Sequence, residues 1–233
     1  MRNLCRQVFQ IKESQCTIIS DSIDGVEKAK ESITRNRNQL ERYVQKNPRF
    51  LHSLKPIKPP KEPKVALLMA EAAAKSNVGP MAAVAGVIAD LAVEDMTAAG
   101  CKVAVVEDGG EVSAMSDRPI DIALAAGDDP WSRKFGFRLT NFPYGLATSS
   151  GRFSHALSFG DAEAATVFCE NAGLADAAAT AVGNVVKGED RQEALRKGLD
   201  TALSILGVEG ALILYRGLVG TVGKIPLIIR VTS

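Results

Sequence analysis

The sequence is poor in aromatic side chains and has no long apolar run. Phe, Trp and Tyr make up 5% of the 233 residues, which argues against an aromatic-lined binding surface and favours close packing of small residues. The most apolar run, from Met81 to Ala89, is too short to cross a bilayer, so we expect no membrane partner. An apolar signal region ahead of Cys5 is also missing, and a cytoplasmic location is expected.

Paired cysteines are missing too. The four cysteines are scattered at positions 5, 16, 101 and 169, and no two of them form a C-x-x-C pair. A disulfide framework and a structural zinc site are therefore not expected. A reducing compartment fits this use of cysteine.

The chain carries almost no net charge, but the charge is unevenly distributed. It has 28 basic and 27 acidic side chains, a net charge of +1 that argues against a nucleic-acid partner. From Arg35 to Lys64, however, there are nine Lys or Arg and two Glu, a local excess of +7 that leaves −6 for the remainder. The simpler interpretation is a solvated helix face followed by a basic loop. The alternative is a docking strip for phosphates or an acidic partner.

The order of the predicted elements indicates an α+β protein. Two strand-like runs within residues 3–20 predict a hairpin, and Asp21 or Ser22 can cap a following helix that stops by Asn47. Prolines within about 48–63 predict an irregular surface connection. Further helices are predicted at 64–75, 81–100, 170–184 and 189–206, and strands at 102–107, 111–116, 120–125, 134–140, 145–150, 164–169, 211–217, 218–221 and 224–233. We predict a single domain over residues 1–233, with helices packed over a mixed or antiparallel sheet and small-residue faces that permit a homo-oligomer.

One candidate site is a glycine turn between two predicted strands. Asp108, Gly109 and Gly110 form the turn in the stretch VVEDGGEVSA, and a tight hairpin turn favours such residues because they accept a positive φ. A second interpretation is compatible with the first. The bare backbone can approach a phosphate or a ring, with Glu107 and Glu111 beside it.

A second candidate is the stretch YGLATSSGRFSHALSFGD. The turn of Ser149, Ser150 and Gly151 exposes backbone N–H groups that suit an anion. Arg152 can pair with a phosphate, and His155 can move a proton near neutral pH, although a lone histidine on a strand often has a structural role.

The third candidate is the small-residue helix ENAGLADAAATAVGN. Asp176 and Thr180 lie one turn apart on one stripe, with Asn184 one turn further on. Asp176 gains ~0.3–1 kcal/mol from the helix dipole without any further role, and Thr180 can back-bond to a carbonyl. In the alternative interpretation, the two side chains are hard oxygen ligands of the kind that Mg²⁺ accepts together with water and substrate phosphate.

These stretches together resemble one known family. GLATSSGRFSHAL followed by GLADAAATAV resembles the flavin transferase ApbE family, whose members carry a T-S-G turn, a following S-H and an A-D-A-x-x-T-A helix. VVEDGGEVSA is similar to its N-x-G-G-D hairpin, and VAGVIAD more weakly to its G-K-G-x-x-x-D helix. The short ApbE-like proteins of bacteria and archaea, distant relatives of the transferases, are closer still, and that match runs over essentially the whole chain.

The resemblance implies an ApbE-like α+β fold and a Mg²⁺ site at Asp176 and Thr180, because the matching Asp and Thr bind Mg²⁺ in the transferases. It places His155 at the family's histidine near the site, and the serine turn at the family's T-S-G turn. The implied ligand is a phosphate-containing small molecule such as FAD or FMN.

The sequence also departs from the transferases. Only Arg152 and Phe153 separate Gly151 from Ser154, where the transferases have a long insertion, and LSFGD replaces their D-P-x-T-G segment. Two interpretations follow. The first is a Mg²⁺-dependent enzyme acting on a flavin nucleotide or another pyrophosphate-containing cofactor. The second is a non-catalytic module of the same fold that binds a cofactor or a partner.

Overall fold

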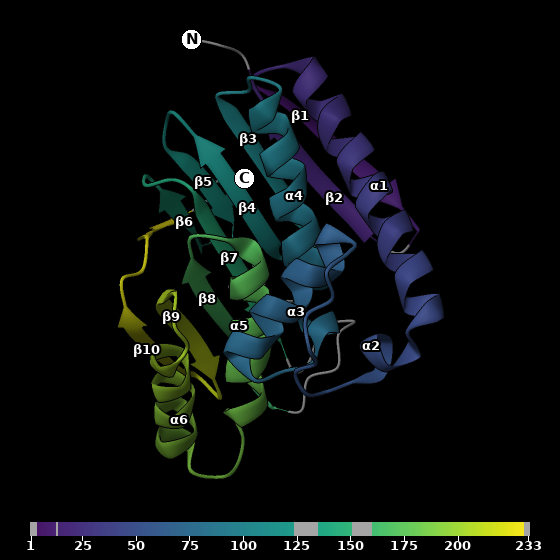
Figure 1. Ribbon diagram of the computed structural model, residues 1–233. Coiled ribbons are helices and arrows are strands. Elements are labelled where there is room, and N and C mark those ends of the chain that lie inside the picture. Colours follow the sequence, from purple (N-terminus) through teal and green to yellow (C-terminus); the bar gives the residue numbers. More distant parts are fainter. Residues whose placement is uncertain (1–3, 13, 124–134, 151–159, 231–233) are drawn as a thin grey trace.

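A large antiparallel sheet forms the middle layer of the protein. The computed structural model describes residues 4–12, 14–123, 135–150 and 160–230 (Figure 1). Within them, the eight strands of this sheet lie side by side in chain order, each antiparallel to its neighbours. They are β1 (Cys5–Ile11), β2 (Ser14–Ser20), β3 (Val103–Asp108), β4 (Glu111–Ser116), β7 (Tyr144–Ser149), β8 (Ala164–Cys169), β9 (Val208–Tyr215) and β10 (Leu218–Gly223).

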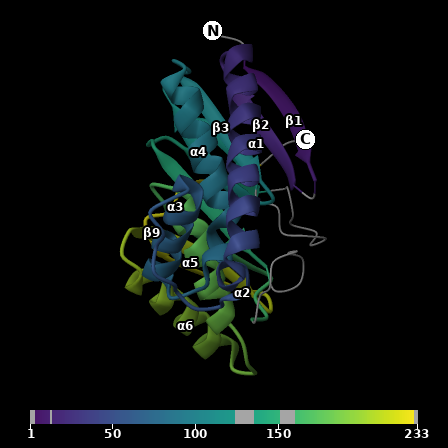
Figure 2. The same ribbon diagram turned by 45° about the vertical axis from the view of Figure 1, so that its right-hand side comes forward.

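Helices cover one face of this sheet (Figures 1 and 2). They are α1 (Ile23–Lys46), α2 (Pro48–His52), α3 (Lys64–Ser76), the short 3₁₀ helix η1 (Pro80–Ala83), α4 (Val84–Ala98), α5 (Ala172–Val185) and α6 (Arg191–Ser204). Their starts follow the local sequence. Ser22 caps α1 by accepting a hydrogen bond from the Gly25 N–H (3.4 Å), and Asn171 caps α5 through the Leu174 N–H (2.9 Å).

A second, smaller sheet covers the other face. It contains β5 (Ile120–Ala123), β6 (Phe135–Leu139) and β11 (Leu227–Arg230), with β6 in the middle. Side chains of β3 alternate between two cores: Val103 and Val105 pack toward the small sheet, whereas Ala104 and Val106 pack toward the helices. β3 therefore reads as a continuous apolar run because both of its faces are covered.

The predicted fold class is confirmed, and the predicted helices and strands are present within the described residues, with the predicted helix at 81–100 divided into η1 and α4. Residues 124–125, 134 and 231–233 of the predicted strands lie outside the described residues. The proline-rich connection begins as the short helix α2 and continues as irregular chain from Ser53 to Pro63. No single helix in the described ranges is long and apolar enough to span a membrane. The helix α3 and the stretch Pro80–Ala98 together have the required length and apolar composition, but the chain bends by 103° between them.

Candidate functional site

Two helices meet at the candidate site, and each binds the start of the other through a carboxylate. The Gly86 N–H at the start of α4 donates to Asp176 Oδ2 on α5 (3.0 Å). In return, the N–H groups of Ala172 and Gly173 at the start of α5 donate to the two oxygens of Asp90 on α4 (2.9 and 2.8 Å). The residue preceding α4, Ala83, offers no side-chain cap, so Asp176 satisfies a donor at this helix start that would otherwise lack a partner.

Small residues allow this crossing. A Cβ atom added to Gly86 would lie 2.2 Å from the carbonyl oxygen of Ala172, and one added to Gly173 would lie 2.5 Å from Val87 Cγ2. A larger residue at either position would push the helices apart. The close approach therefore fixes where Asp176 lies relative to α4.

The side of α5 that carries Asp176 is its one partly accessible edge. Every residue from Ala172 to Gly183 is buried except Asp176 and Thr180, and Asn184 one turn later is again half-buried. The remaining surface packs against α3, α4, α6 and the strands β7 and β8. The predicted polar stripe is therefore the line along which this helix meets solvent.

The predicted glycine turn is confirmed as a hairpin between β3 and β4. Asp108 and Glu111 lie opposite each other, and Gly109 and Gly110 between them have φ angles of +71° and +116°. A Cβ added to Gly110 would lie 3.9 Å from the carbonyl oxygen of Thr148. The turn thus lies beside the end of β7, which leads directly into the predicted serine turn.

The carboxylates of the site raise one another's pKa. Burial is the largest cause of the rise in the Asp176 pKa to about 7, and the charges of Asp108 and Asp90 add to it against the opposing effect of the Gly86 N–H. Burial, followed by the charges of Asp176 and Asp108, raises the pKa of Glu111 well above its usual range. The hairpin and α5 therefore bring several carboxylates close enough to interact.

The Cys16 thiol lies next to this cluster. It is fully buried, and burial, followed by the charge of Asp108, raises its pKa to about 12. Asp108 itself is 5% exposed.

The structure brings together most of the predicted site residues. Asp176 and Thr180 share the half-buried edge of α5, and Asp108, Gly109 and Gly110 belong to the hairpin turn. Ser149 ends β7 beside that turn, and the buried Ser150 follows it. The remaining three, Gly151, Arg152 and His155, lie outside the described residues.

Reasoning from the sequence missed the role of Asp90. The signal was present, because Asp90 is the last residue of VAGVIAD, the stretch that matches the family's G-K-G-x-x-x-D helix. Its carboxylate binds two N–H groups at the start of α5 and so positions the helix that carries Asp176.

The donors at the α5 edge fit a hard cation. No three His, Cys, Asp or Glu side chains among the described residues are arranged to hold a metal ion. Asp176 and Thr180 nevertheless offer a carboxylate and a hydroxyl one turn apart, and Mg²⁺ commonly completes its shell with water and substrate phosphate. The hairpin places the Glu111 carboxyl group close enough to Asp176 for the two charges to interact.

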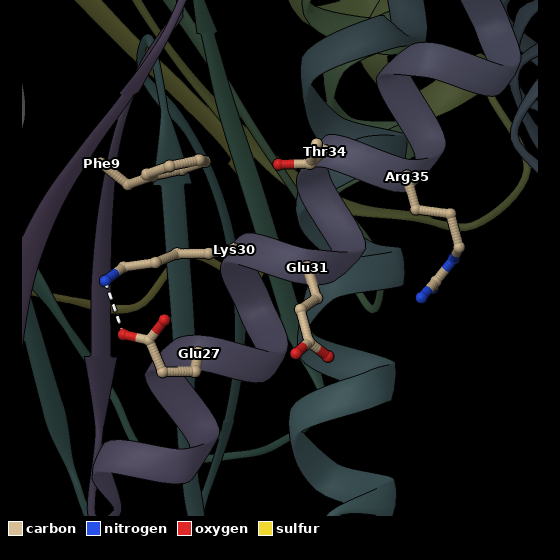
Figure 3. Close-up of a pocket in the computed structure, with 6 residues that line it drawn as sticks. All are labelled: Phe9, Glu27, Lys30, Glu31, Thr34 and Arg35. Atoms are coloured by element: carbon tan, nitrogen blue, oxygen red, sulfur yellow. Dashed lines mark hydrogen bonds and ion pairs between the residues drawn. The ribbon is translucent and has the colours of Figure 1, made fainter.

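A surface depression of about 540 Å³ lies elsewhere, between β1 and α1. Its charged side chains are already paired: Lys30 with Glu27 (2.7 Å), as Figure 3 shows, Glu31 with Lys28 (2.7 Å), and Arg35 with Asp95. None of the predicted site residues lines it.

The fold defines the protein as ApbE-like. The structure matches the ApbE protein of Thermotoga maritima with a TM-score of 0.65 at 15% identity, over 98% of this chain and 97% of that one. It matches the apo form of the Pseudomonas stutzeri flavinyl transferase ApbE with a TM-score of 0.60 at 16% identity, over 94% of each chain. These TM-scores establish a shared fold, and at identities this low the likeness shows the fold alone.

Sequence comparison is more specific. The family described as AbpE bacteria matches residues 2–209. UPF0280 proteins of Methanococcus vannielii and Methanosphaerula palustris are 39% and 40% identical to this chain, over 97% and 98% of its length and 94% and 95% of theirs. The chain therefore belongs to this family of short ApbE-like proteins.

Proposed function

We propose that this protein is a Mg²⁺-dependent enzyme that binds a flavin nucleotide, or another pyrophosphate-containing small molecule, and cleaves or transfers its phosphoryl group. The observation that carries the proposal is the polar edge of α5. An otherwise buried helix is partly accessible at Asp176 and Thr180, beside a hairpin that carries further carboxylates. Similarity to proteins described as flavin transferases supplies the substrate class.

Asp176 and Thr180 would hold the metal. One oxygen of Asp176 is already oriented by the Gly86 N–H, so the carboxylate has a fixed direction before any ligand arrives. Bound Mg²⁺ would neutralise the charge that develops on phosphate oxygens as the phosphoryl bond breaks. A nearby cation would also relieve the repulsion between Asp176 and the hairpin carboxylates.

The other residues would bind and orient the substrate. Backbone N–H groups of Ser150 and Gly151 would bind phosphate oxygens, and Arg152 would pair with the same phosphates. The turn at Gly109 and Gly110 has no Cβ atoms, so its backbone can approach a ring or a phosphate closely.

His155 would act as the acid or base. It would take the proton from the attacking hydroxyl group or donate one to the leaving phosphate. Both roles suit an imidazole that titrates near neutral pH.

Calorimetry tests the proposal directly. Binding of FAD, FMN and ADP is measured with and without Mg²⁺ for the wild type, for Asp176→Asn and for the control Asp200→Asn. Asp200 is an exposed residue of α6 that pairs with Arg196, so its substitution removes one carboxylate far from the site. We expect Mg²⁺-dependent binding that the site variant loses and the control retains. Equal Mg²⁺ affinity in all three proteins would refute the metal site.

A second candidate function is a non-catalytic module that binds a cofactor or partner. It is favoured by the short connection between Gly151 and Ser154, where the transferases carry a long insertion. Turnover of a flavin dinucleotide into its two mononucleotides, lost in His155→Ala, would exclude it. Ligand binding without turnover would favour it.

A further inference from the structure

The basic segment between α1 and α3 forms a surface that the candidate site does not use. We infer that this surface docks an acidic segment of a partner protein. We call it the basic strip, and it consists of Lys46, Arg49, Lys55, Lys58 and Lys61 together with Leu51 and Leu54. All five cations are exposed, and the two leucines are 41% and 59% exposed.

The cations of the basic strip differ from their neighbours in their ion pairing. Among the described residues, none of the five has a carboxylate within ion-pair distance. The cations that flank this region in the sequence differ: Arg35 pairs with Asp95, and Lys64 with Glu94 (2.7 Å). Within the described part of the chain, the strip thus carries five cations without an ion pair and one carboxylate, that of Glu62, so its excess positive charge is complementary to an acidic partner.

The lysines are held in place by a proline-rich backbone. Lys55, Lys58 and Lys61 recur at every third residue, and Pro56 and Ile57 between them are half-buried. Proline fixes φ, so the segment loses little conformational entropy when a ligand binds. A row of lysines on a stiff support suits an extended polypeptide with repeated carboxylates.

The surroundings favour a protein partner over nucleic acid or a membrane. Two aromatic rings belong to this part of the sequence, Tyr43 and Phe50, and they pack edge to face at 5.1 Å with Phe50 buried, so this pair offers no platform for stacked bases. Leu51 and Leu54 are too few to anchor the chain in a bilayer. Because the two leucines lie among lysines, the strip suits a partner segment in which acidic residues alternate with apolar ones.

The basic strip shares a support with the candidate site. A Cβ added to Gly79 would lie 1.8 Å from the carbonyl oxygen of Ser53 and 3.0 Å from Leu54 Cα, so the strip packs at Leu54 against the chain that leads into η1. The helix α4 follows η1, and its Gly86 N–H binds Asp176. A partner docked on the strip would therefore lie on the scaffold that positions the start of α4.

Fluorescence anisotropy with a labelled peptide of repeating Glu-Glu-Leu tests the inference. The test variant combines Lys55→Glu, Lys58→Glu and Lys61→Glu, and a milder variant carries Gln at the same positions. The matched control reverses three other exposed lysines, Lys102, Lys187 and Lys224, and so changes the net charge equally. All six positions are exposed, and thermal unfolding confirms that each variant folds.

We expect salt-sensitive binding of the peptide that weakens at least ~10-fold in the test variant, less in the Gln variant, and under ~2-fold in the control. Equal losses in the test variant and the control would overturn the inference, because they would reflect net charge alone. Tighter binding to oligothymidylate or to phosphatidylserine vesicles than to the peptide would overturn it in favour of those partners. The assay contains neither flavin nor Mg²⁺, so its outcome is independent of the proposed enzyme activity.

Discussion

Substitution of Asp176 by Asn tests whether ionisation of this carboxylate destabilises the folded protein. Burial, opposed by the Gly86 N–H and reinforced by neighbouring carboxylates, raises the Asp176 pKa from its usual 3.8 to about 7. An acid whose pKa is higher in the folded state binds its proton more tightly when folded. Ionisation of Asp176 therefore costs folding free energy, beginning as the pH rises past about 4 and complete above about pH 7.

The size of the effect follows from the shift. A rise of this extent corresponds to roughly 4 kcal/mol as an upper limit, since each pH unit of displacement corresponds to about 1.4 kcal/mol. Asn keeps an oxygen that can accept from the Gly86 N–H, so the substitution preserves the helix contact while it removes the charge. In metal-free protein, we expect the stability of Asp176→Asn relative to the wild type to increase by about 2–4 kcal/mol between about pH 4 and pH 8.

Urea unfolding at the two pH values, in the presence of EDTA, measures this difference, with Asp200→Asn as the exposed control. Mg²⁺ added at the higher pH should raise the midpoint of the wild type and leave that of Asp176→Asn unchanged. A variant that is less stable than the wild type by the same amount at both pH values would refute the reasoning. In that case Asp176 would be an ordinary ionised carboxylate that caps α4.

Three further predictions concern the helix crossing and the thiols. Gly86→Ala should lower the free energy of unfolding by about 2–4 kcal/mol in urea denaturation, because its Cβ would meet the Ala172 carbonyl oxygen at 2.2 Å. The control Gly100→Ala, at a position with φ +94° and open space around it, should lower it by only about 1 kcal/mol. Equal losses of stability in the two variants would exclude the steric explanation. Asp90→Asn should lower the free energy of unfolding by about 1–2 kcal/mol, because the amide NH2 group replaces one of the two acceptor oxygens and leaves one N–H group at the start of α5 facing another donor. Thermal unfolding with no change would contradict this role. With a thiol reagent near pH 8, only the half-buried Cys5 should react quickly, while Cys16 and the other buried thiols should react only after denaturation; rapid reaction of all four thiols would contradict their burial.

The elements of the fold were predictable because their signals are local. The helix from Ile23 to Lys46 has an apolar repeat, a serine cap and a following Asn-Pro stop, and all three lie within one stretch of sequence. The turn at Gly109 and Gly110 is likewise specified by its own residues, and so is the polar stripe of α5.

The division into two sheets was not predictable from such signals. β11 pairs with β6, about ninety residues earlier in the chain, and β5 pairs with the other edge of β6. Each of the three reads simply as a short strand. Which strands pair is decided by non-local packing over Phe137, Leu139 and Phe168 between the sheets, which no single segment encodes.

The helix crossing shows the same limit at the candidate site. Read locally, Gly86 and Gly173 only weaken their helices, since glycine costs about 1 kcal/mol in a helix interior. The need for glycine at these two positions follows only from the contact between the two helices, which joins positions far apart in the sequence. The same contact explains why Asp90 and Asp176 each bind the other helix.

The two roles of Asp176, as cap of α4 and as proposed metal ligand, are compatible. The alanines and glycines of α5 let neighbouring backbones approach so closely that only one edge of the helix remains accessible. On that edge, the N–H group of α4 orients the carboxylate, while burial and the charges of the hairpin make its ionised form costly. A divalent cation would offset that cost and a solvated surface carboxylate would not need one, so the cost itself favours binding of a cation at this edge.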